Sequence, residues 1–140
     1  MQESAKAAFS LCKRMANDFG IDSKEFEKKE LHIHIPQVPG GVEGPSAGIA
    51  MTTAIVSCFT GKKVKPHLAM TGEVSLAGRV LPIGGVRDKL MAAARVGVKT
   101  VLLPKDNEKD LKDIPSEVKE SLDIHLVSNI LEVINLALEV

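Results

Sequence analysis

The residue of this sequence with the clearest chemical potential is Ser46, within the stretch Gly40-Gly41-Val42-Glu43-Gly44-Pro45-Ser46-Ala47-Gly48. The stretch runs directly into an apolar segment, so Ser46 is expected at the start of a helix. A serine there can cap the helix by accepting a backbone N–H bond. It can also be a nucleophile whose oxyanion product faces free N–H groups and the positive helix end. Both interpretations are open from this stretch alone.

A nucleophilic serine needs a base, and few histidines follow Ser46 in this sequence. Residues 44–48 fit G-x-S-x-G, the nucleophile elbow of α/β-hydrolases, in which the serine follows a strand directly. Here a loop with two glycines and a proline intervenes, and only His67 and His125 follow Ser46. We therefore exclude that fold and do not expect a Ser-His-Asp triad.

Lysine is the other base that can activate a serine. It acts as a base only when neutral, so its pKa must fall by roughly three units from about 10.4, through burial or a nearby cation. Lys89 follows Gly84-Gly85 in a segment rich in alanine and leucine, which can supply that burial. Other lysines stand in polar runs and are expected to be fully charged: Lys62, Lys63, Lys65, Lys105 and Lys109.

A pair of histidines, His32 and His34, alternates with apolar residues from Leu31 to Ile35. This period of two predicts a strand over 31–35 with both histidines on one face. Two histidines at such spacing could ligate a metal, but further ligands are not evident nearby. We favour the interpretation that they line a polar face or a cleft.

The elements around these residues must position them. Apolar spacing predicts a helix over 2–19 and a second, almost wholly apolar helix over about 46–59, whose burial would hold Ser46 rigidly. Strands over 68–74 and 80–83 are expected to form a hairpin, followed by a helix over about 86–96. The remaining pattern predicts a strand over 99–103, helical pieces over 106–113 and 115–122, a strand over 124–127 and a final helix capped by Ser128. Such alternation indicates an α/β or α+β class.

Composition limits the remaining possibilities. The chain has 140 residues, the length of one domain, and it opens abruptly on a helical pattern, as a fragment of a longer protein would. The 18 basic and 18 acidic side chains balance, so nucleic-acid binding through bulk charge is not expected. No segment reaches the roughly 18 apolar residues of a membrane span. Cys12 and Cys58 fall on apolar helical faces and are expected to be buried thiols, as in a reducing compartment.

Three separated motifs together resemble one known family. Residues 44–48 (GPSAG), 69–73 (AMTGE) and 81–89 (LPIGGVRDK) match, in order and spacing, the proteolytic domain of Lon, the ATP-dependent serine protease. The similarity runs over essentially the whole chain. It implies a mixed α+β fold, the Lon protease-domain fold, which resembles the ribosomal protein S5 domain 2-like fold. Residues 1–140 would then be a truncated Lon-type proteolytic domain.

The resemblance also assigns roles to residues. It implies that Ser46 is the nucleophile of a Ser-Lys dyad, that Lys89 is its general base, and that Thr71 orients the lysine. It places His32 and His34 in a strand beside the active site. Glu43 stands where many family members have aspartate, so a role for its carboxylate does not carry over in detail. The loop and oxyanion positions are Gly44, Pro45 and Ala47.

The function implied by the resemblance is ATP-dependent endopeptidase activity on unfolded or damaged proteins, through an acyl-enzyme. ATP and Mg²⁺ would be used by an AAA+ ATPase domain of the full-length protein, because this chain has no G-x-x-x-x-G-K-[ST] loop. No cofactor or metal is expected in this chain. The expected partners are polypeptide substrates, that ATPase domain and further copies in a homo-hexamer. The expected location is the bacterial cytoplasm, with the mitochondrial matrix as the alternative.

Two other functions remain as alternatives. A glycine loop at a helix start can bind phosphate, as in the GHMP group of small-molecule kinases, whose fold resembles that of Lon. Their loop usually has adjacent serines, whereas Ser46 is alone, and Thr71 and Lys89 would have no task. The other alternative is an inactive Lon-like assembly domain. Such a domain would be expected to lose the serine or the lysine, and this chain keeps both.

Overall fold

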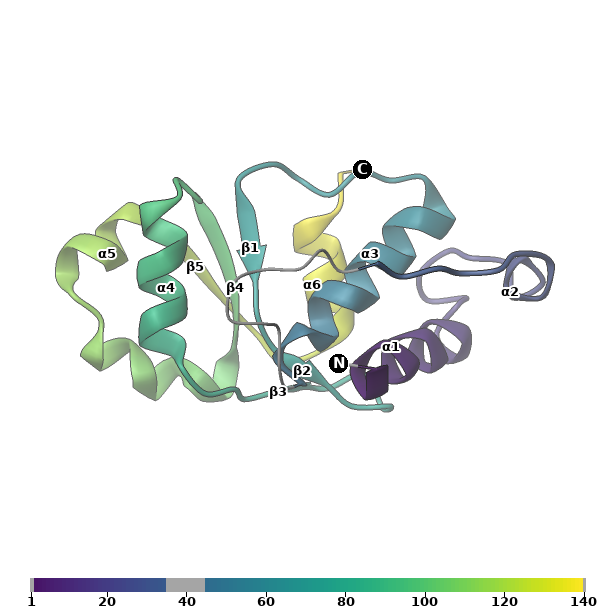
Figure 1. Ribbon diagram of the computed structural model, residues 1–140, viewed down its shortest axis with the longest axis horizontal. Helices are drawn as coiled ribbons and strands as arrows, with labels where there is room; N and C mark the ends of the chain where they lie inside the picture. Colours follow the sequence, from purple (N-terminus) through teal and green to yellow (C-terminus); the bar gives the residue numbers. More distant parts are fainter. Residues whose placement is uncertain (1, 35–44, 140) are drawn as a thin grey trace.

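The computed structural model describes residues 2–34 and 45–139, and these form a mixed α+β fold (Figure 1). A parallel sheet in the order β1-β4-β5 consists of β1 (Leu68–Met70), β4 (Thr100–Pro104) and β5 (Asp123–Val127). Beside it lies an antiparallel pair of β2 (Glu73–Val74) and β3 (Val80–Leu81). The predicted α+β class is thereby confirmed.

Helices cover the sheet on both sides, with α4 and α5 on one side and α1, α3 and α6 on the other (Figure 1). Two short 3-10 helices, η1 and η2, precede α3 and follow β4 respectively. The helical bounds are α1 (Gln2–Arg14), α2 (Glu25–Lys28), η1 (Pro45–Ala47), α3 (Gly48–Thr60), α4 (Val86–Arg95), η2 (Lys105–Asp113), α5 (Ser116–Ser121) and α6 (Ile130–Ala137). In the described part of the chain, no helix is long and apolar enough to cross a membrane.

The central strand β4 divides the core in two. Its side chains alternate, so that Leu102 joins one apolar cluster while Val101 and Leu103 join the other. The first cluster fills the space between α1, α3 and α6, and the second lies under α4 and α5. Each fully buried Leu, Ile or Val in these clusters contributes about 1.5–3 kcal/mol relative to an exposed one. The helix that follows Ser46 (α3) and the helix that carries Lys89 (α4) are therefore anchored in different cores, on opposite sides of β4.

The predicted hairpin is wrong in its first half. The segment 68–74 is not one strand: Leu68–Met70 pairs with β4 in parallel, and only Glu73–Val74 pairs with β3. The strand breaks because the backbone turns toward α3 at Thr71 and Gly72. There the Thr71 N–H donates to the Leu102 carbonyl (3.2 Å), and the Gly72 N–H donates to the Ser46 carbonyl (2.8 Å).

Three further predictions need correction. Residues 31–34 form no strand, since none of the described strands pairs with them, and Ile35 lies outside the described residues. Alternation reports only the side-chain pattern, whereas a strand requires a partner. The N-cap of α6 is Asn129 rather than Ser128, whose hydroxyl instead donates to the Glu132 carboxylate (2.8 Å). The first helix ends at Arg14, and residues 15–20 form turns that end at Gly20, whose φ is +74°.

Candidate active site

Ser46 lies in η1, directly before α3, and its backbone is fixed by the segment that follows β1. Its carbonyl accepts hydrogen bonds from the Gly72 N–H (2.8 Å) and from Thr71 Oγ1 (3.4 Å). The Ile49 N–H in turn donates to the Gly72 carbonyl (3.1 Å). These bonds join the start of α3 to the end of β1, so Ser46 and Thr71 hold a fixed relation to each other.

Ser46 does not cap α3, so the capping interpretation is wrong. The N-cap residue is Ala47, and the helix has no side-chain cap. Within the described residues the Ser46 hydroxyl makes no hydrogen bond, although its side chain is only partly exposed.

Two glycines permit this close packing of α3 against the chain after β1. A Cβ added at Gly48 would lie 2.9 Å from the backbone nitrogen of Val74 and 3.2 Å from its Cγ1. A Cβ added at Gly72 would lie 3.1 Å from side-chain atoms of Ile49 and Val80. A side chain at Gly48 would collide with the backbone of Val74, and one at Gly72 would crowd the side chains of Ile49 and Val80, so both glycines allow the close packing of this junction.

Lys89 reaches this junction from the first turns of α4. Its Nζ donates to Thr71 Oγ1 (3.3 Å), which makes the Thr71 hydroxyl a bridge between the lysine and the Ser46 carbonyl. Lys89 is half-buried, and this burial lowers the pKa of its amine from the ordinary 10.5. No described carboxylate forms an ion pair with it to oppose the shift. Burial thus shifts the amine toward the neutral form, which is the form a general base requires.

One cavity of about 330 Å³ brings the three polar side chains together. Ser46, Thr71 and Lys89 line it with small and apolar residues from α3, α4 and the sheet: Ala47, Ala50, Ala69, Met70, Leu90, Ala92, Ala93 and Val101. No direct hydrogen bond joins the Ser46 hydroxyl to Lys89 Nζ among the described residues. Catalytic hydrogen bonds are often long before substrate binds and tighten in the complex. The arrangement can therefore activate a serine nucleophile next to an apolar side-chain pocket.

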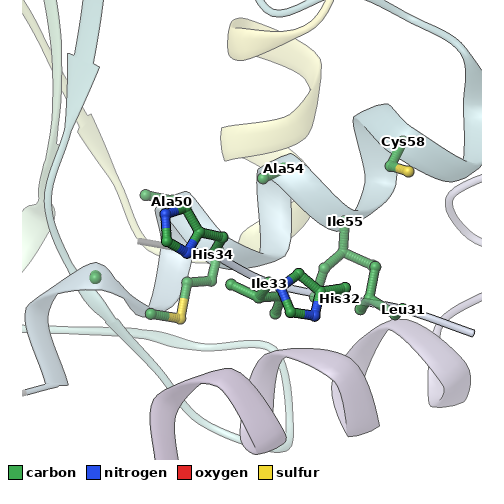
Figure 2. Close-up of a pocket in the computed structure, with 10 residues that line it drawn as sticks. Leu31, His32, Ile33, His34, Ala50, Ala54, Ile55 and Cys58 are labelled. Carbon is green, nitrogen blue, oxygen red and sulfur yellow. The ribbon is translucent and has the colours of Figure 1, made fainter. Parts of the chain in front are cut away.

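The structure does not bring His32 and His34 into this cavity. They line a neighbouring one of about 430 Å³, between residues 31–34 and α3 (Figure 2). The two cavities share Ala47 and Ala50. Residues 2–34 and 45–139 contain no group of three His, Cys, Asp or Glu side chains that could hold a metal ion. The histidines line a cleft, as one of the sequence interpretations predicts, but on no described strand.

The other sequence predictions about the site have mixed outcomes. Glu43 and Gly44 lie outside the described residues, so their roles stay predictions. Pro45 opens η1, and Ala47 lines both cavities as well as serving as the N-cap of α3. Cys12 is buried as predicted, but Cys58 is exposed, which corrects that prediction. The reason is that α3 leaves one side uncovered by described residues, where Ala54 is also exposed.

One buried polar residue near the site was missed by sequence reasoning. Asn107 is only 2% exposed, and its side chain hydrogen-bonds the backbone of Ile83, just before α4. It stands in the polar run of 105–113, where an asparagine ordinarily marks a solvated turn. Nothing in the local pattern distinguishes it, because its partner is 24 residues away in the sequence.

Comparisons with known proteins agree on one family. The model of the Lon protease (S16) C-terminal proteolytic domain matches residues 1–140. Lon protease of Haemophilus influenzae is 52% identical over 139 residues, which cover 99% of this chain and 17% of that protein. Lon protease of Escherichia coli K12 is 51% identical over 139 residues, which cover 99% of this chain and 18% of that protein. The chain thus spans less than a fifth of the length of these relatives.

Proposed function

Because this chain belongs to the family of Lon protease (S16) C-terminal proteolytic domains, we propose that it hydrolyses peptide bonds with a catalytic dyad of Ser46 and Lys89. One observation carries the proposal. The Thr71 hydroxyl joins the Ser46 carbonyl to Lys89 Nζ at the edge of an apolar cavity. Burial there lowers the pKa of Lys89, which moves the amine toward the neutral form that the reaction needs.

The reaction begins when neutral Lys89 takes the proton of Ser46 Oγ as that oxygen attacks the peptide carbonyl carbon. Backbone N–H groups next to Ser46 that are free to point at the substrate hold the resulting oxyanion, aided by the positive end of the helix dipole. Protonated Lys89 then gives its proton to the leaving amine, which leaves an ester on Ser46. A water molecule, deprotonated by Lys89, attacks this ester; the acyl–Oγ bond breaks, the acid is released, and Ser46 Oγ takes the proton from Lys89. Thr71 keeps the lysine amine within reach of Ser46 in both steps.

The wider setting is proposed from the relatives. Proteins named Lon protease match this chain over a small part of their length, so we propose that it works beside an ATPase domain that uses ATP and Mg²⁺. The proposed substrates are unfolded or damaged polypeptides, and the proposed assembly is a homo-hexamer. The proposed location is the bacterial cytoplasm, which the source organisms of the relatives and the two free cysteines support.

The direct test is covalent capture of the nucleophile. The chain is incubated with a peptidyl boronate, and the adduct is mapped by mass spectrometry. We expect an adduct on Ser46 that is lost in Ser46→Ala and strongly reduced in Lys89→Met. Peptide hydrolysis should fall by at least about 10³-fold in both variants, as for other members of catalytic pairs. Comparable hydrolysis by wild type and either folded variant would rule out the dyad.

A further inference from the structure

Asn107, in η2, makes an unusually complete set of hydrogen bonds for a side chain outside the proposed dyad. Its Oδ1 accepts from the Ile83 N–H (2.9 Å), and its Nδ2 donates to the Ile83 carbonyl (2.8 Å). The same Nδ2 also donates to Asp110 Oδ2 (2.8 Å). The amide thus pairs with both backbone groups of one residue, much as a neighbouring strand would. The acceptor on Asp110 fixes which way the amide faces, because the reverse orientation would oppose oxygen to oxygen.

The residue it holds lies in the connection from β3 to the helix that carries Lys89. Gly85 follows Ile83 by two residues, adopts φ +71° at the start of α4, and accepts the Lys89 N–H on its carbonyl (3.1 Å). Little else holds this connection. Pro82, Gly84 and Gly85 are exposed, and a Cβ at either glycine would meet open space. Among the described residues, no other side chain hydrogen-bonds the backbone of 82–85.

The hydrogen bonds to Ile83 add a directional constraint to the packing of α4. Val86 and Leu90 bury α4 in the second core, and Ile83 is partly buried against it. Apolar contacts of this kind hold the helix against the sheet, but the hydrophobic effect behind them is not directional. The paired hydrogen bonds to Ile83 are directional and lie just N-terminal to the first turn, where they oppose a shift of the helix start.

We propose that Asn107 is a positioning residue for Lys89, which acts by clamping the backbone of Ile83 and so fixing the start of α4 relative to Thr71. This inference rests on the proposed function, in which Lys89 is the general base. Without the clamp, α4 can shift, and the lysine amine loses its contact with Thr71 Oγ1 and gains water. A misplacement of about 1 Å of a catalytic group costs up to about 10²-fold in rate.

The test compares Asn107→Leu, which removes the hydrogen bonds at similar volume, with Asn107→Ala, which removes them without an apolar side chain. The matched control is Asn129→Leu, the same change at the N-cap of α6, whose amide oxygen accepts the Glu132 N–H (3.1 Å). All variants are made in the protein as it occurs in the cell, with any sequence that flanks this chain there. Circular dichroism and thermal melting establish which variants are folded.

Two readouts follow, and one of them does not depend on peptidase activity. The Lys89 amine is titrated by NMR of ¹³C-labelled lysine, and its signal is assigned by its loss in Lys89→Met. In parallel, kcat and KM of a fluorogenic peptide are measured against pH. We expect the Lys89 titration to move to higher pH in both Asn107 variants. We also expect kcat to fall by about 10- to 100-fold near neutral pH with partial recovery at high pH, and the Asn129→Leu protein to match wild type in both.

Three results would overturn the inference. One is a folded Asn107 variant with an unmoved Lys89 titration and kcat within about threefold of wild type. Another is an equal shift in Asn129→Leu, which would indicate general loosening. The third is loss of folding in both Asn107 variants, which would make the residue a determinant of stability instead. Failure of the proposed function is separate, because it would appear as wild-type hydrolysis that persists in Ser46→Ala while the NMR titration still reports on the clamp.

Discussion

The substitution Thr71→Val isolates the hydroxyl that joins the two proposed catalytic residues. Valine keeps the shape of threonine, and it keeps the backbone bond from residue 71 to the Leu102 carbonyl (3.2 Å). The Ser46 carbonyl also keeps its shorter bond from the Gly72 N–H (2.8 Å). What is lost is the pair of longer bonds through Thr71 Oγ1, at 3.4 Å to the Ser46 carbonyl and 3.3 Å from Lys89 Nζ. We therefore expect a loss of stability of only about 1 kcal/mol.

The expected effect on catalysis is larger than the effect on stability. Lys89 has no other described hydrogen-bond partner, so its amine would be free to turn away from Ser46. A hydrogen bond to a charged or developing charged group contributes about 1.5–3 kcal/mol, which corresponds to a 10- to 100-fold fall in kcat/KM. The fall should lie mainly in kcat, because Thr71 touches the base and is not expected to bind the substrate in its ground state.

The assay is steady-state cleavage of a fluorogenic peptide by wild type, Thr71→Val and Thr71→Ser. Serine restores the hydroxyl without the methyl group, so Thr71→Ser should recover most of the activity. Urea unfolding of the three proteins corrects for any difference in folded fraction. A folded Thr71→Val protein with wild-type kcat would refute the reasoning, since it would show that the bridge in the structure does not hold the base.

Three other predictions use the same structure. Burial lowers the pKa of Lys89 from the ordinary 10.5, so kcat/KM should rise with pH through a midpoint below 10.5 as the amine loses its proton. Between that midpoint and 10.5 the unfolded chain binds more protons at Lys89 than the folded protein does, so the charged lysine destabilises the fold at lower pH. The free energy of unfolding in urea, measured for wild type and for Lys89→Met, should show this destabilisation disappear as the pH rises through that range. Gly48→Ala should destabilise by about 1–3 kcal/mol in urea unfolding, because its Cβ would lie 2.9 Å from Val74 N, whereas Gly84→Ala meets open space and should change stability little. Burial raises the pKa of Cys12 to about 12, so a thiol reagent at pH 8 should label only Cys58 in the native protein, and the Cys58→Ser protein should remain unlabelled.

The sequence predicts most helices and the α+β class because their signals are local. The apolar face of α3, the glycine turn before α4 and the apolar run of β4 each lie within a short window. Prediction from sequence fails where the secondary structure of a segment depends on a partner far away in the chain. The pattern of residues 68–74 predicts one strand, but the first part pairs with β4 and the second part pairs with β3. Residues 31–35 carry a strand pattern, but none of the described strands pairs with 31–34.

The candidate site divides in the same way. Ser46 and Lys89 stand out from their local sequence, the resemblance to the Lon family adds Thr71, and the structure brings all three to one cavity. Their mutual geometry could not be predicted, because it depends on contacts across the fold. The capping interpretation of Ser46, one of the two left open by the sequence, fails because a 3-10 turn moves the start of the helix to Gly48. Asn107 looks like a surface residue until Ile83 is placed beside it.

The three separated motifs are better understood as one packing contact than as three independent signatures. Gly48 and Gly72 are small because the start of α3 and the segment after β1 touch, and two backbone hydrogen bonds join Ser46 and Ile49 to Gly72. That contact places Thr71 under the Ser46 carbonyl, and Thr71 in turn receives Lys89 from α4. Since α3 and α4 are held in different cores, this junction is where the described structure joins the proposed nucleophile to the proposed base. A substitution that loosens it, such as Gly48→Ala, should therefore reduce kcat by more than its effect on the folded fraction explains.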